Sequence, residues 1–345
     1  MIKVLVVDDS PLIRRILTDV LCEPDDIEVV GCAEDPYQAR EMIKQLKPDV
    51  LTLDVEMPKM DGISFLKNLM RLRPMPVVMI STLTQKGSPV TLEALELGAI
   101  DFIAKPTVNV SEQFNHYAAV LQQKVRTAAS ARVRPFKASH NPPLEPSLMA
   151  NFNVSAILAI GASTGGTEAI KEVLVRMPKN CPPIVITQHI PPVFSSSFAL
   201  RMDRTCTINV KEAEHGDKLA PGWAFIAPGD KHLSVVKRGS HLVCQLDESA
   251  AINRHRPAVD VLFNSLVHIH PKNTMAALLT GMGNDGAKGL LTLKQNGAYT
   301  IAQDELTSVV WGMPKAAIEL GAANDVLPLE KVADHLLKKA QKQSN

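Results

Sequence analysis

Short apolar runs alternate with longer amphipathic stretches over most of this chain of 345 residues. This alternation is typical of a parallel β-sheet whose strands are connected by helices that cover its faces. It occurs twice, from residue 1 to about 120 and again from Ser155 to the C-terminus. A chain of this length is also too long for one ordinary hydrophobic core. The sequence therefore predicts two α/β domains, each built on a doubly wound parallel sheet.

Five apolar runs in the first region have the length and composition of buried strands. They are Lys3–Val7, Glu28–Cys32, Val50–Leu53, Pro76–Ile80 and Asp101–Ala104. The second region has four such runs, near 155–160, 183–187, 275–280 and 298–302. Three shorter runs separated by turns predict an antiparallel hairpin region at one edge of the second sheet. They are Trp223–Ile226, Leu233–Val236 and Leu242–Leu246.

The segment that joins the two regions has a different composition. No acidic residue occurs between Gln113 and Leu144, and the segment carries several basic residues and the helix-breaking run Asn141-Pro142-Pro143. A solvated hinge is favoured over a contact with RNA or lipid. We therefore predict a first domain at residues 1–122, a linker at 123–150 and a second domain at 151–345.

Composition excludes several classes of protein. The formal net charge of +1 gives no general reason to expect binding to nucleic acid or to an anionic membrane. The five cysteines are scattered without a C-x-x-C pair, which favours reduced thiols over disulfides or a zinc site. The N-terminus does not resemble a signal peptide, and no apolar run reaches the roughly 18 residues that a membrane span requires. We expect a cytoplasmic chain that neither inserts into a membrane nor binds nucleic acid.

Polar residues follow the expected strands of the first region. Asp8 and Asp9 follow the first strand, Asp54 the third, Ser81 the fourth and Lys105 the fifth. The carboxyl ends of parallel strands meet at one edge of the sheet, and carboxylates gathered there suit Mg²⁺. Asp54 could then attack a phosphoryl group whose oxygens Ser81 and Lys105 bind. The alternative, that Asp8 and Asp9 only cap the next helix, explains one pair and not the convergence.

These residues resemble the receiver domain of two-component response regulators, which has a flavodoxin-like fold. The matching segments, in order, are Val6-Val7-Asp8-Asp9-Ser10, Met57-Pro58-Lys59-Met60-Asp61-Gly62 after Asp54, Ile80-Ser81-Thr82 and Lys105-Pro106. The resemblance implies that Asp54 is the phosphoacceptor, Ser81 the switch hydroxyl and Lys105 the charge sensor. It implies Mg²⁺ as the cofactor for phosphorylation, held by Asp8, Asp9, Asp54 and the backbone carbonyl of Glu56.

The second region contains the segment Gly161-Ala162-Ser163-Thr164-Gly165-Gly166 between an expected strand and helix. A serine between glycines at such a turn is typical of a nucleophile elbow. The next strand ends at His189, and a later strand leads into a glycine-rich turn with Met282 and Asp285. Ser163, His189 and Asp285 could act as nucleophile, general base and orienting carboxylate. We expect the backbone N–H of Met282 to stabilise the oxyanion.

The order serine, histidine, aspartate differs from that of the α/β-hydrolases, which favours a separate solution on a Rossmann-like sheet. Simpler interpretations remain open for each part. The glycines from 161 to 166 could form a dinucleotide loop, although no acidic residue ends the next strand. His189 could be structural, and Asp285 could cap the helix that follows it. Their joint placement favours catalysis.

Other polar residues of the second region give weaker signals. Six histidines could suggest a metal site and are interpreted as surface or packing residues: His215, His232, His241, His255, His268 and His270. His268 and His270 lie two positions apart near a helix end, with no carboxylate at metal-ligand spacing. The basic segment Asn253-Arg254-His255-Arg256-Pro257 could bind an acidic substrate or pair with acidic neighbours. A place at the rim of the site is favoured, because Pro257 stiffens the segment before an apolar helix.

Taken together, these motifs resemble the chemotaxis response-regulator protein-glutamate methylesterases. The resemblance implies hydrolysis of γ-glutamyl methyl esters on the cytoplasmic helices of methyl-accepting chemotaxis receptors, and deamidation of receptor glutamines. It implies a chemotaxis histidine kinase as phosphodonor and no cofactor in the esterase domain. It also implies that the unphosphorylated receiver obstructs Ser163 until Asp54 is phosphorylated. The alternatives are a response regulator with a non-catalytic protein-docking output domain, and an oxidoreductase or nucleotide-binding output that uses Gly161 to Gly166.

Overall fold

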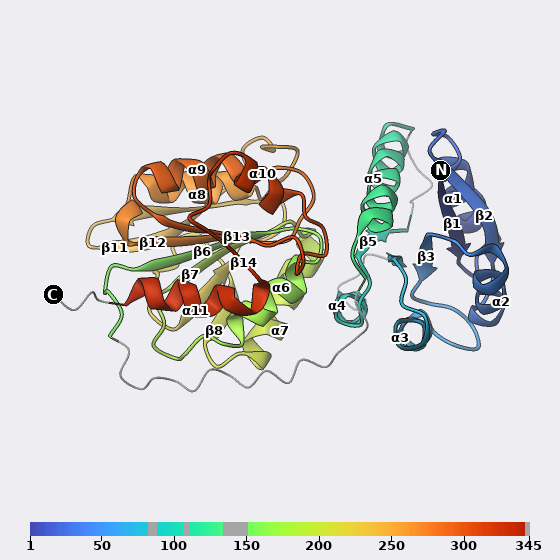
Figure 1. Cartoon of the computed structure of the whole chain (residues 1–345), viewed down its shortest axis with the longest axis horizontal. Helices are drawn as coiled ribbons and strands as arrows, with labels where there is room; N and C mark the ends of the chain where they lie inside the picture. The colour runs from blue at the N-terminus through green and yellow to red at the C-terminus, as the bar shows by residue number, and fades with distance from the viewer. Residues whose placement is uncertain (82–87, 106–110, 134–150, 342–345) are drawn as a thin grey trace. The chain divides into compact units, whose positions relative to one another are not determined.

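The computed structural model of the chain describes residues 1–81, 88–105, 111–133 and 151–341. The chain divides into two compact units, Met1–Ala138 and Ser139–Asn345 (Figure 1). Thr82 and Pro106, which belong to the motifs above, lie outside the described residues. In the part of the chain that is described, no helix is both long enough and apolar enough to span a membrane.

The first unit contains a five-stranded parallel sheet in the order β2-β1-β3-β4-β5. Its strands are β1 (Ile2–Val7), β2 (Ile27–Ala33), β3 (Val50–Asp54), β4 (Val77–Ser81) and β5 (Asp101–Ala104). Its helices are α1 (Pro11–Leu21), α2 (Pro36–Leu46), α3 (Gly62–Leu72), α4 (Ser88–Glu96) and α5 (Ser111–Ser130). All five predicted strands are confirmed. The strand order reverses between β1 and β3, so the carboxyl ends of these strands flank a crevice in this type of fold.

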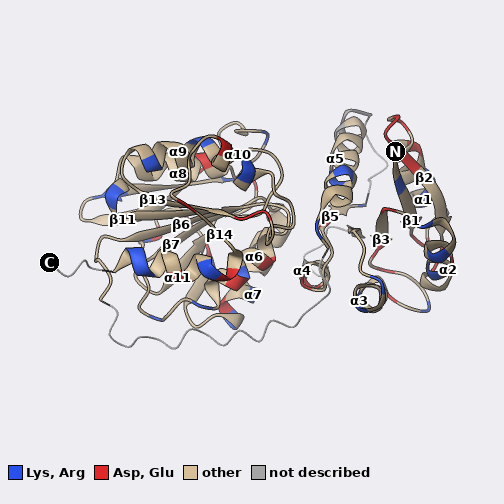
Figure 2. Cartoon of the chain, in the orientation of Figure 1, with Lys and Arg blue, Asp and Glu red and all other residues tan. Residues whose placement is uncertain are grey.

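Burial explains why the strands of the first unit were visible as continuous apolar runs. Every residue of β3 and β4 is buried, as expected for a parallel sheet covered on both faces. Charged residues lie mainly on helices and loops, with few on the strands (Figure 2). The helix α1 is capped by Ser10, whose hydroxyl accepts from the N–H of Ile13 at 3.4 Å. Helix capping therefore does not account for Asp8 and Asp9.

The helix α5 continues past residue 122, where the first domain is expected to end. It reaches Ser130, and Val125 and Ala128 are fully buried. Apolar residues at helical spacing continue the packed face through this region. Arg126, one of the basic residues of the expected linker, pairs with Asp26 at 2.7 Å. The first part of the expected linker is thus a packed helix, and residues 134–150 of it lie outside the described residues.

The second unit contains a seven-stranded sheet in the order β14-β13-β12-β6-β7-β9-β8. Its strands are β6 (Ile157–Ala162), β7 (Ile184–Gln188), β8 (Asn209–Glu212), β9 (Trp223–Ile226), β12 (Thr274–Leu278), β13 (Tyr299–Gln303) and β14 (Asp325–Leu327). Its helices are α6 (Gly166–Leu174), α7 (Pro192–Thr205), α8 (Val259–Val267), the short η1 (Pro271–Asn273), α9 (Ala287–Gln295), α10 (Met313–Glu319) and α11 (Leu329–Ala340). The helices α8, α9 and α10 cover one face of the sheet, and α6, α7 and α11 cover the other (Figure 1).

The antiparallel hairpin of the second unit is confirmed, but one strand was assigned to it wrongly. It is formed by β10 (His232–Arg238) and β11 (His241–Asp247), which make a separate two-stranded sheet. The strand β9 pairs in parallel with both β7 and β8. A short apolar run does not encode strand direction, so the sequence alone could not separate β9 from the hairpin that follows it.

The strand order of the second unit also reverses near its centre. The chain leaves β6 toward β7 on one side and later returns with β12 on the other side of β6. All residues of these three strands are buried, and their carboxyl ends lie at the same edge. This is the switch point at which ligands bind in open α/β sheets.

Candidate active site and phosphoacceptor site

Three side chains that are distant in sequence meet at the switch point of the second unit. Ser163 directly follows β6, and its backbone N–H donates to the carbonyl of Thr280 at 3.0 Å. His189 directly follows β7. Its Nδ1 lies 3.1 Å from Oγ of Ser163, and its Nε2 lies 2.9 Å from Oδ2 of Asp285. A continuous hydrogen-bonded relay therefore joins a hydroxyl, an imidazole and a carboxylate.

The ring nitrogens of His189 have the opposite assignment to that of the common serine protease relay, in which Nε2 faces the serine and Nδ1 the aspartate. In this chain Nδ1 faces Ser163 and Nε2 faces Asp285. A neutral imidazole carries one proton, and the carboxylate can only accept a hydrogen bond while it is ionised. The proton therefore belongs on Nε2, which leaves Nδ1 as the acceptor for the hydroxyl of Ser163.

The carboxylate of Asp285 is almost fully buried, with a relative exposure of 1%, and it accepts hydrogen bonds on both oxygens. Besides His189, the donors to Oδ2 and Oδ1 are Val259 N at 2.6 Å, Asn253 Nδ2 at 2.7 Å and Asp260 N at 3.2 Å. Burial by itself would raise the pKa of Asp285, but the hydrogen bond and charge of His189, with the other donors, hold it at about 2. The carboxylate is therefore ionised at neutral pH.

Asp285 binds the N-terminus of a different helix from the one that a simple cap would bind. The helix α9, which follows it in sequence, has Gly286 at its N-cap and no side-chain capping bond. Asp285 instead accepts from the first two residues of α8, which begins at Val259. The partial positive charge of a helix N-terminus favours an anion there. Asp285 thus connects the start of α8 to the imidazole.

Two glycines allow the backbone to approach Ser163. A Cβ atom at Gly281 would lie 2.7 Å from Cβ of Ser163 and 2.3 Å from Sδ of Met313, so only glycine fits there. The turn that leads to Met282 therefore packs directly against the serine. A Cβ atom at Gly166 would lie 2.1 Å from Oε1 of Gln188. The assignment of Met282 as oxyanion donor stays a prediction.

The structure adds Gln188 to the site, to which the sequence gave no role, and gives specific contacts to two residues of the basic segment expected at its rim. The amide of Gln188 donates to the carbonyls of Ser163 at 2.9 Å and His189 at 3.1 Å. The ring of His255, which was interpreted as a surface or packing residue, stacks on the ring of His189. Asn253 contacts Asp285, as described above. The basic segment before α8 was a signal for such a place, but it could not specify these contacts.

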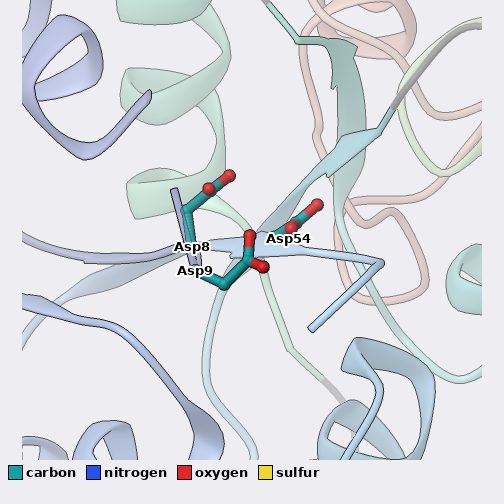
Figure 3. Close-up of side chains that lie close together, drawn as sticks. All are labelled: Asp8, Asp9 and Asp54. Atoms are coloured by element: carbon teal, nitrogen blue, oxygen red, sulfur yellow. The ribbon is translucent and has the colours of Figure 1, made fainter. Parts of the chain in front are cut away.

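The first unit has its polar cluster at the ends of β1 and β3. The carboxylates of Asp8, Asp9 and Asp54 have oxygens within 4.8 Å of one another, and Figure 3 shows them projecting from neighbouring strand ends. The ammonium of Lys105 lies 2.8 Å from Oδ2 of Asp54 and 3.2 Å from Oδ2 of Asp8. The predicted convergence of these four residues is present.

The carboxylates of this cluster suit a divalent cation. Within the described residues, Oδ1 of Asp54 has no hydrogen-bond partner although it is buried. Oδ2 of Asp8 is within ion-pair distance of Lys105, but without hydrogen-bond geometry. Burial raises the pKa of Asp54 to about 6 and also raises the pKa of Asp8, so their charges are under-compensated. Hard, partly unpaired oxygen atoms are the ligands that Mg²⁺ prefers.

The two remaining residues predicted for this site lie beside it. Ser81 is buried at the end of β4, and its hydroxyl accepts from Oγ1 of Thr91 at 3.2 Å. Glu56 is exposed and follows Asp54 by two positions. Its carbonyl as a metal ligand and Ser81 as a switch remain predictions.

The fold and the two sites define a serine hydrolase joined in one chain to a phosphoacceptor domain. Residues 158–336 match the family model of CheB methylesterase, and residues 4–113 match that of the response regulator receiver domain. The chain belongs to the CheB methylesterase family and carries a receiver domain at its N-terminus.

Curated relatives match over nearly the whole chain. A protein-glutamate methylesterase/protein-glutamine glutaminase 2 of Pseudomonas aeruginosa is 52% identical, covering 100% of this chain and 98% of the relative. A protein-glutamate methylesterase/protein-glutamine glutaminase of Salmonella typhimurium is 50% identical, covering 98% and 97%. The crystal structure of the CheB methylesterase catalytic domain of Thermotoga maritima is 44% identical, with a TM-score of 0.52, and covers 53% of this chain and 98% of that chain.

Proposed function

We propose that this chain removes methyl groups from glutamyl methyl esters of chemotaxis receptors and deamidates receptor glutamines, under control of phosphorylation at Asp54. The observation that carries the proposal is the relay from Ser163 through His189 to Asp285 at the switch point of the second sheet. The names of the full-length relatives support the choice of a protein glutamyl ester and a protein glutamine as substrates. Receptors with cytoplasmic methylation sites would place the chain in the cytoplasm.

In the first half of the reaction, Oγ of Ser163 attacks the ester carbonyl carbon while Nδ1 of His189 takes its proton. The negative charge that develops on the carbonyl oxygen accepts a hydrogen bond from the N–H of Met282. Nδ1 then returns the proton to the methoxy oxygen, the C–O bond breaks and methanol leaves. The product is a glutamyl ester of Ser163.

In the second half, water attacks the acyl-enzyme and gives one proton to Nδ1 of His189. The bond to Oγ of Ser163 breaks, and Nδ1 returns this proton to Oγ. The glutamic acid side chain is released and loses its remaining proton to the solvent, which leaves a carboxylate. A glutamine follows the same steps, with ammonia in place of methanol. Asp285 remains ionised throughout and stabilises the imidazolium that forms twice per cycle.

In the receiver domain, a phosphoryl group passes from the phosphohistidine of a kinase to a carboxylate oxygen of Asp54. The P–N bond breaks as the P–O bond forms. Bound Mg²⁺ supplies charge compensation, and it would be held by Asp8, Asp9, Asp54 and the carbonyl of Glu56. The new phosphate adds about −1.5 to −2 charges next to Lys105, which now pairs with Asp54, and draws in the hydroxyl of Ser81.

In this proposal the first unit is the receiver and the second unit is the esterase. The receiver comprises residues 1–122 together with the rest of α5, and the esterase comprises residues 151–345. The linker begins after the end of α5 and extends to residue 150. Magnesium is needed only for the receiver in this proposal.

Methanol release from a methylated receptor fragment tests the proposed function. The full chain is incubated with the fragment, with and without acetyl phosphate and Mg²⁺. We expect release by the wild type, stimulation by the phosphodonor, and no release by Ser163→Ala, which should still be phosphorylated at Asp54. Equal release by Ser163→Ala would reassign the nucleophile. Binding of the fragment without any release would favour a docking output instead.

A further inference from the structure

A tight turn at residues 252–255 touches two members of the relay, and the mechanism above uses neither contact. We propose that Asn253 and His255 are positioning residues of the esterase. Asn253 fixes the carboxylate of Asp285, and His255 fixes the ring plane of His189. This inference rests on the proposed function, and it adds two residues that hold the side chains of the relay in their reactive orientation.

The backbone of the turn is closed and strained. Ile252 and His255 exchange backbone hydrogen bonds at 3.0 and 2.9 Å, and the two residues between them, Asn253 and Arg254, have φ angles of 53° and 67°. Left-handed conformations are uncommon outside glycine, although asparagine tolerates them. Such strain persists where surrounding contacts over-determine the backbone, and it concentrates at functional sites.

Contacts made by Arg256, which follows the turn, and by His232 of β10 hold the turn in place. Arg256 donates to the carboxylate of Asp230 at 2.9 Å and to the carbonyl of Glu248 at 2.6 Å. The buried ring of His232 contacts the chain before and after the turn. Its Nε2 lies 3.1 Å from the carbonyl oxygen of Ala250, and its Nδ1 accepts from the backbone N–H of Ala258 at 3.2 Å. The segment before α8 is therefore anchored at several points. A turn held this firmly can fix the side chains that it carries.

Asn253 bridges two carboxylates with one amide group. Its Nδ2 donates to Oδ1 of Asp285 at 2.7 Å and to Oδ2 of Asp260 at 2.8 Å, which uses both amide hydrogens. Both carboxylates are buried, with relative exposures of 1% and 6%. Two like charges so close repel each other unless a donor lies between them. Oδ1 of Asp285 is thereby occupied, which keeps Oδ2 directed at His189.

The burial and charge of this pair agree with the bridging role. Burial raises the pKa of Asp260, and the charge of Asp285 raises it further, while the hydrogen bonds from Gly289 and Asn253 act in the opposite direction. The N–H of Gly289 donates to the other oxygen of Asp260 at 2.7 Å. Removing the Asn253 amide would leave the two carboxylates without their shared donor. The imidazole of His189 would then face a carboxylate pair whose negative charges are less compensated.

His255 restricts the second member of the relay. Its ring lies 3.7 Å from the ring of His189 between centroids, and the two planes are inclined by 12°. The His189 ring has to present both nitrogens within one plane, to Ser163 on one side and to Asp285 on the other. A flat ring stacked on its face blocks rotation out of that plane and covers it from water. Any flat ring of similar size would do this, so the role does not require a second titrating group.

The test uses the full chain and the methylated receptor fragment. We expect Asn253→Ala and His255→Ala to lower kcat roughly 10- to 100-fold, because misplacing reacting groups by about 1 Å has an effect of that size. KM should change little. The control is Ile252→Ala in the same turn, since alanine keeps the backbone hydrogen bonds of Ile252 with His255 and the Ile252 side chain is exposed. We expect this control to keep the wild-type kcat.

Two further readouts separate positioning from a loss of structure. For Asn253→Ala, the acid limb of the pH profile of kcat/KM should move to higher pH, because an uncompensated carboxylate pair favours protonation of the adjacent imidazole. His255→Phe keeps a flat ring and should recover most of the kcat lost in His255→Ala. Folding is followed by the fluorescence of Trp223 and Trp311, which both lie in the second unit. If an alanine variant fails to fold, His255→Phe and Asn253→Ser replace it; the serine keeps one donor and should give an intermediate kcat.

The outcomes distinguish this inference from the proposed function. If the wild type releases no methanol, the proposed function fails. If the wild type is active and the folded Asn253 and His255 variants keep its kcat and pH profile, the positioning roles are wrong and the proposed function stands. A His255→Phe variant as impaired as His255→Ala would overturn the stacking role. An equal loss in Ile252→Ala would show that the turn acts only as a structural unit, and would also overturn the inference.

Discussion

The side-chain amide of Gln188 donates to the backbone carbonyl of Ser163 at 2.9 Å and so ties the end of β7 to the turn that carries the nucleophile. The same nitrogen donates to the carbonyl of His189 at 3.1 Å. One amide therefore sets the separation of the backbones that carry nucleophile and base. Because the side chain is buried, water cannot replace these bonds if they are lost.

Gln188→Glu should lower both kcat and the stability of the second unit. The substitution keeps the shape but replaces a donor with an oxygen that faces two carbonyl oxygens. An unsatisfied or repelled buried polar group costs about 1–3 kcal/mol. Methanol release and thermal melting followed by tryptophan fluorescence measure the two effects. Gln295→Glu, at an exposed position, is the control and should leave kcat unchanged. A variant of Gln188 with wild-type values in both assays would contradict the role given to this amide.

Gly281→Ala should abolish esterase activity. The new methyl group would lie 2.7 Å from Cβ of Ser163 and 2.3 Å from Sδ of Met313, so the serine or the turn has to move. The matched control is Gly216→Ala, where no atom lies within 4 Å of the new Cβ. The control should lose about 1 kcal/mol of stability from its positive φ angle but keep its kcat. Full methanol release by Gly281→Ala would show that the turn does not pack against the nucleophile as described.

Asp54→Asn should keep the basal rate of methanol release and lose the stimulation by acetyl phosphate. Asparagine preserves the size of the side chain and removes the attacking carboxylate. Phosphorylation is measured with labelled phosphodonor in the presence of Mg²⁺, in parallel with methanol release. Asp61→Asn is a suitable control, because Asp61 caps α3 by accepting from the N–H of Ser64 at 2.8 Å and from its hydroxyl at 2.9 Å. Stimulation that persists in Asp54→Asn would place the phosphoacceptor elsewhere.

The stability contributed by the ionised Asp285 should depend on pH in a defined direction. Its pKa is held at about 2 in the folded chain, below the ordinary value of 3.8. The contribution is therefore complete above pH 4 to 5 and is lost as the pH falls toward 2. From the shift, it is on the order of 2 kcal/mol.

The comparison of the wild type with Asp285→Asn measures this contribution, since asparagine resembles the protonated acid. Unfolding is followed by the fluorescence of Trp223 and Trp311, so that the second unit is monitored within the full chain. We expect the wild type to be more stable by a constant amount near neutral pH and the difference to shrink below pH 4. A difference that stays the same from pH 6 to pH 3 would mean that the pKa of Asp285 is not lowered.

The sequence already contained the local part of the fold. The buried strands of both parallel sheets appear as apolar runs, and the five strands of the first unit were all predicted from them. The sequence also placed Ser163 and His189 directly after strands and Asp285 in a glycine-rich turn. Since the carboxyl ends of parallel strands share one edge, these positions were enough to predict that the three would meet.

Other features depended on contacts that no local pattern encodes. The strand β9 and the hairpin after it are similar short apolar runs, and only pairing with β7 and β8 determines which belongs to the parallel sheet. The apolar spacing that carries α5 through Val125 and Ala128 was hidden by the neighbouring basic residues Lys124 and Arg126. These errors arise because strand direction and helix packing depend on distant neighbours.

Sequence by itself determined the elements and the chemistry of their ends, because hydrophobic periodicity and turn residues act over a few positions. Tertiary structure alone decided how His189 and Asp285, 96 positions apart, are oriented: which ring nitrogen faces the carboxylate, and which amide and which ring hold the pair in place. Such contacts follow from the packing of β6, β7, β12 and α8 around one edge. Packing is a property of the whole sheet, and for that reason no single segment of the chain could predict the support that Asn253 and His255 give to the relay.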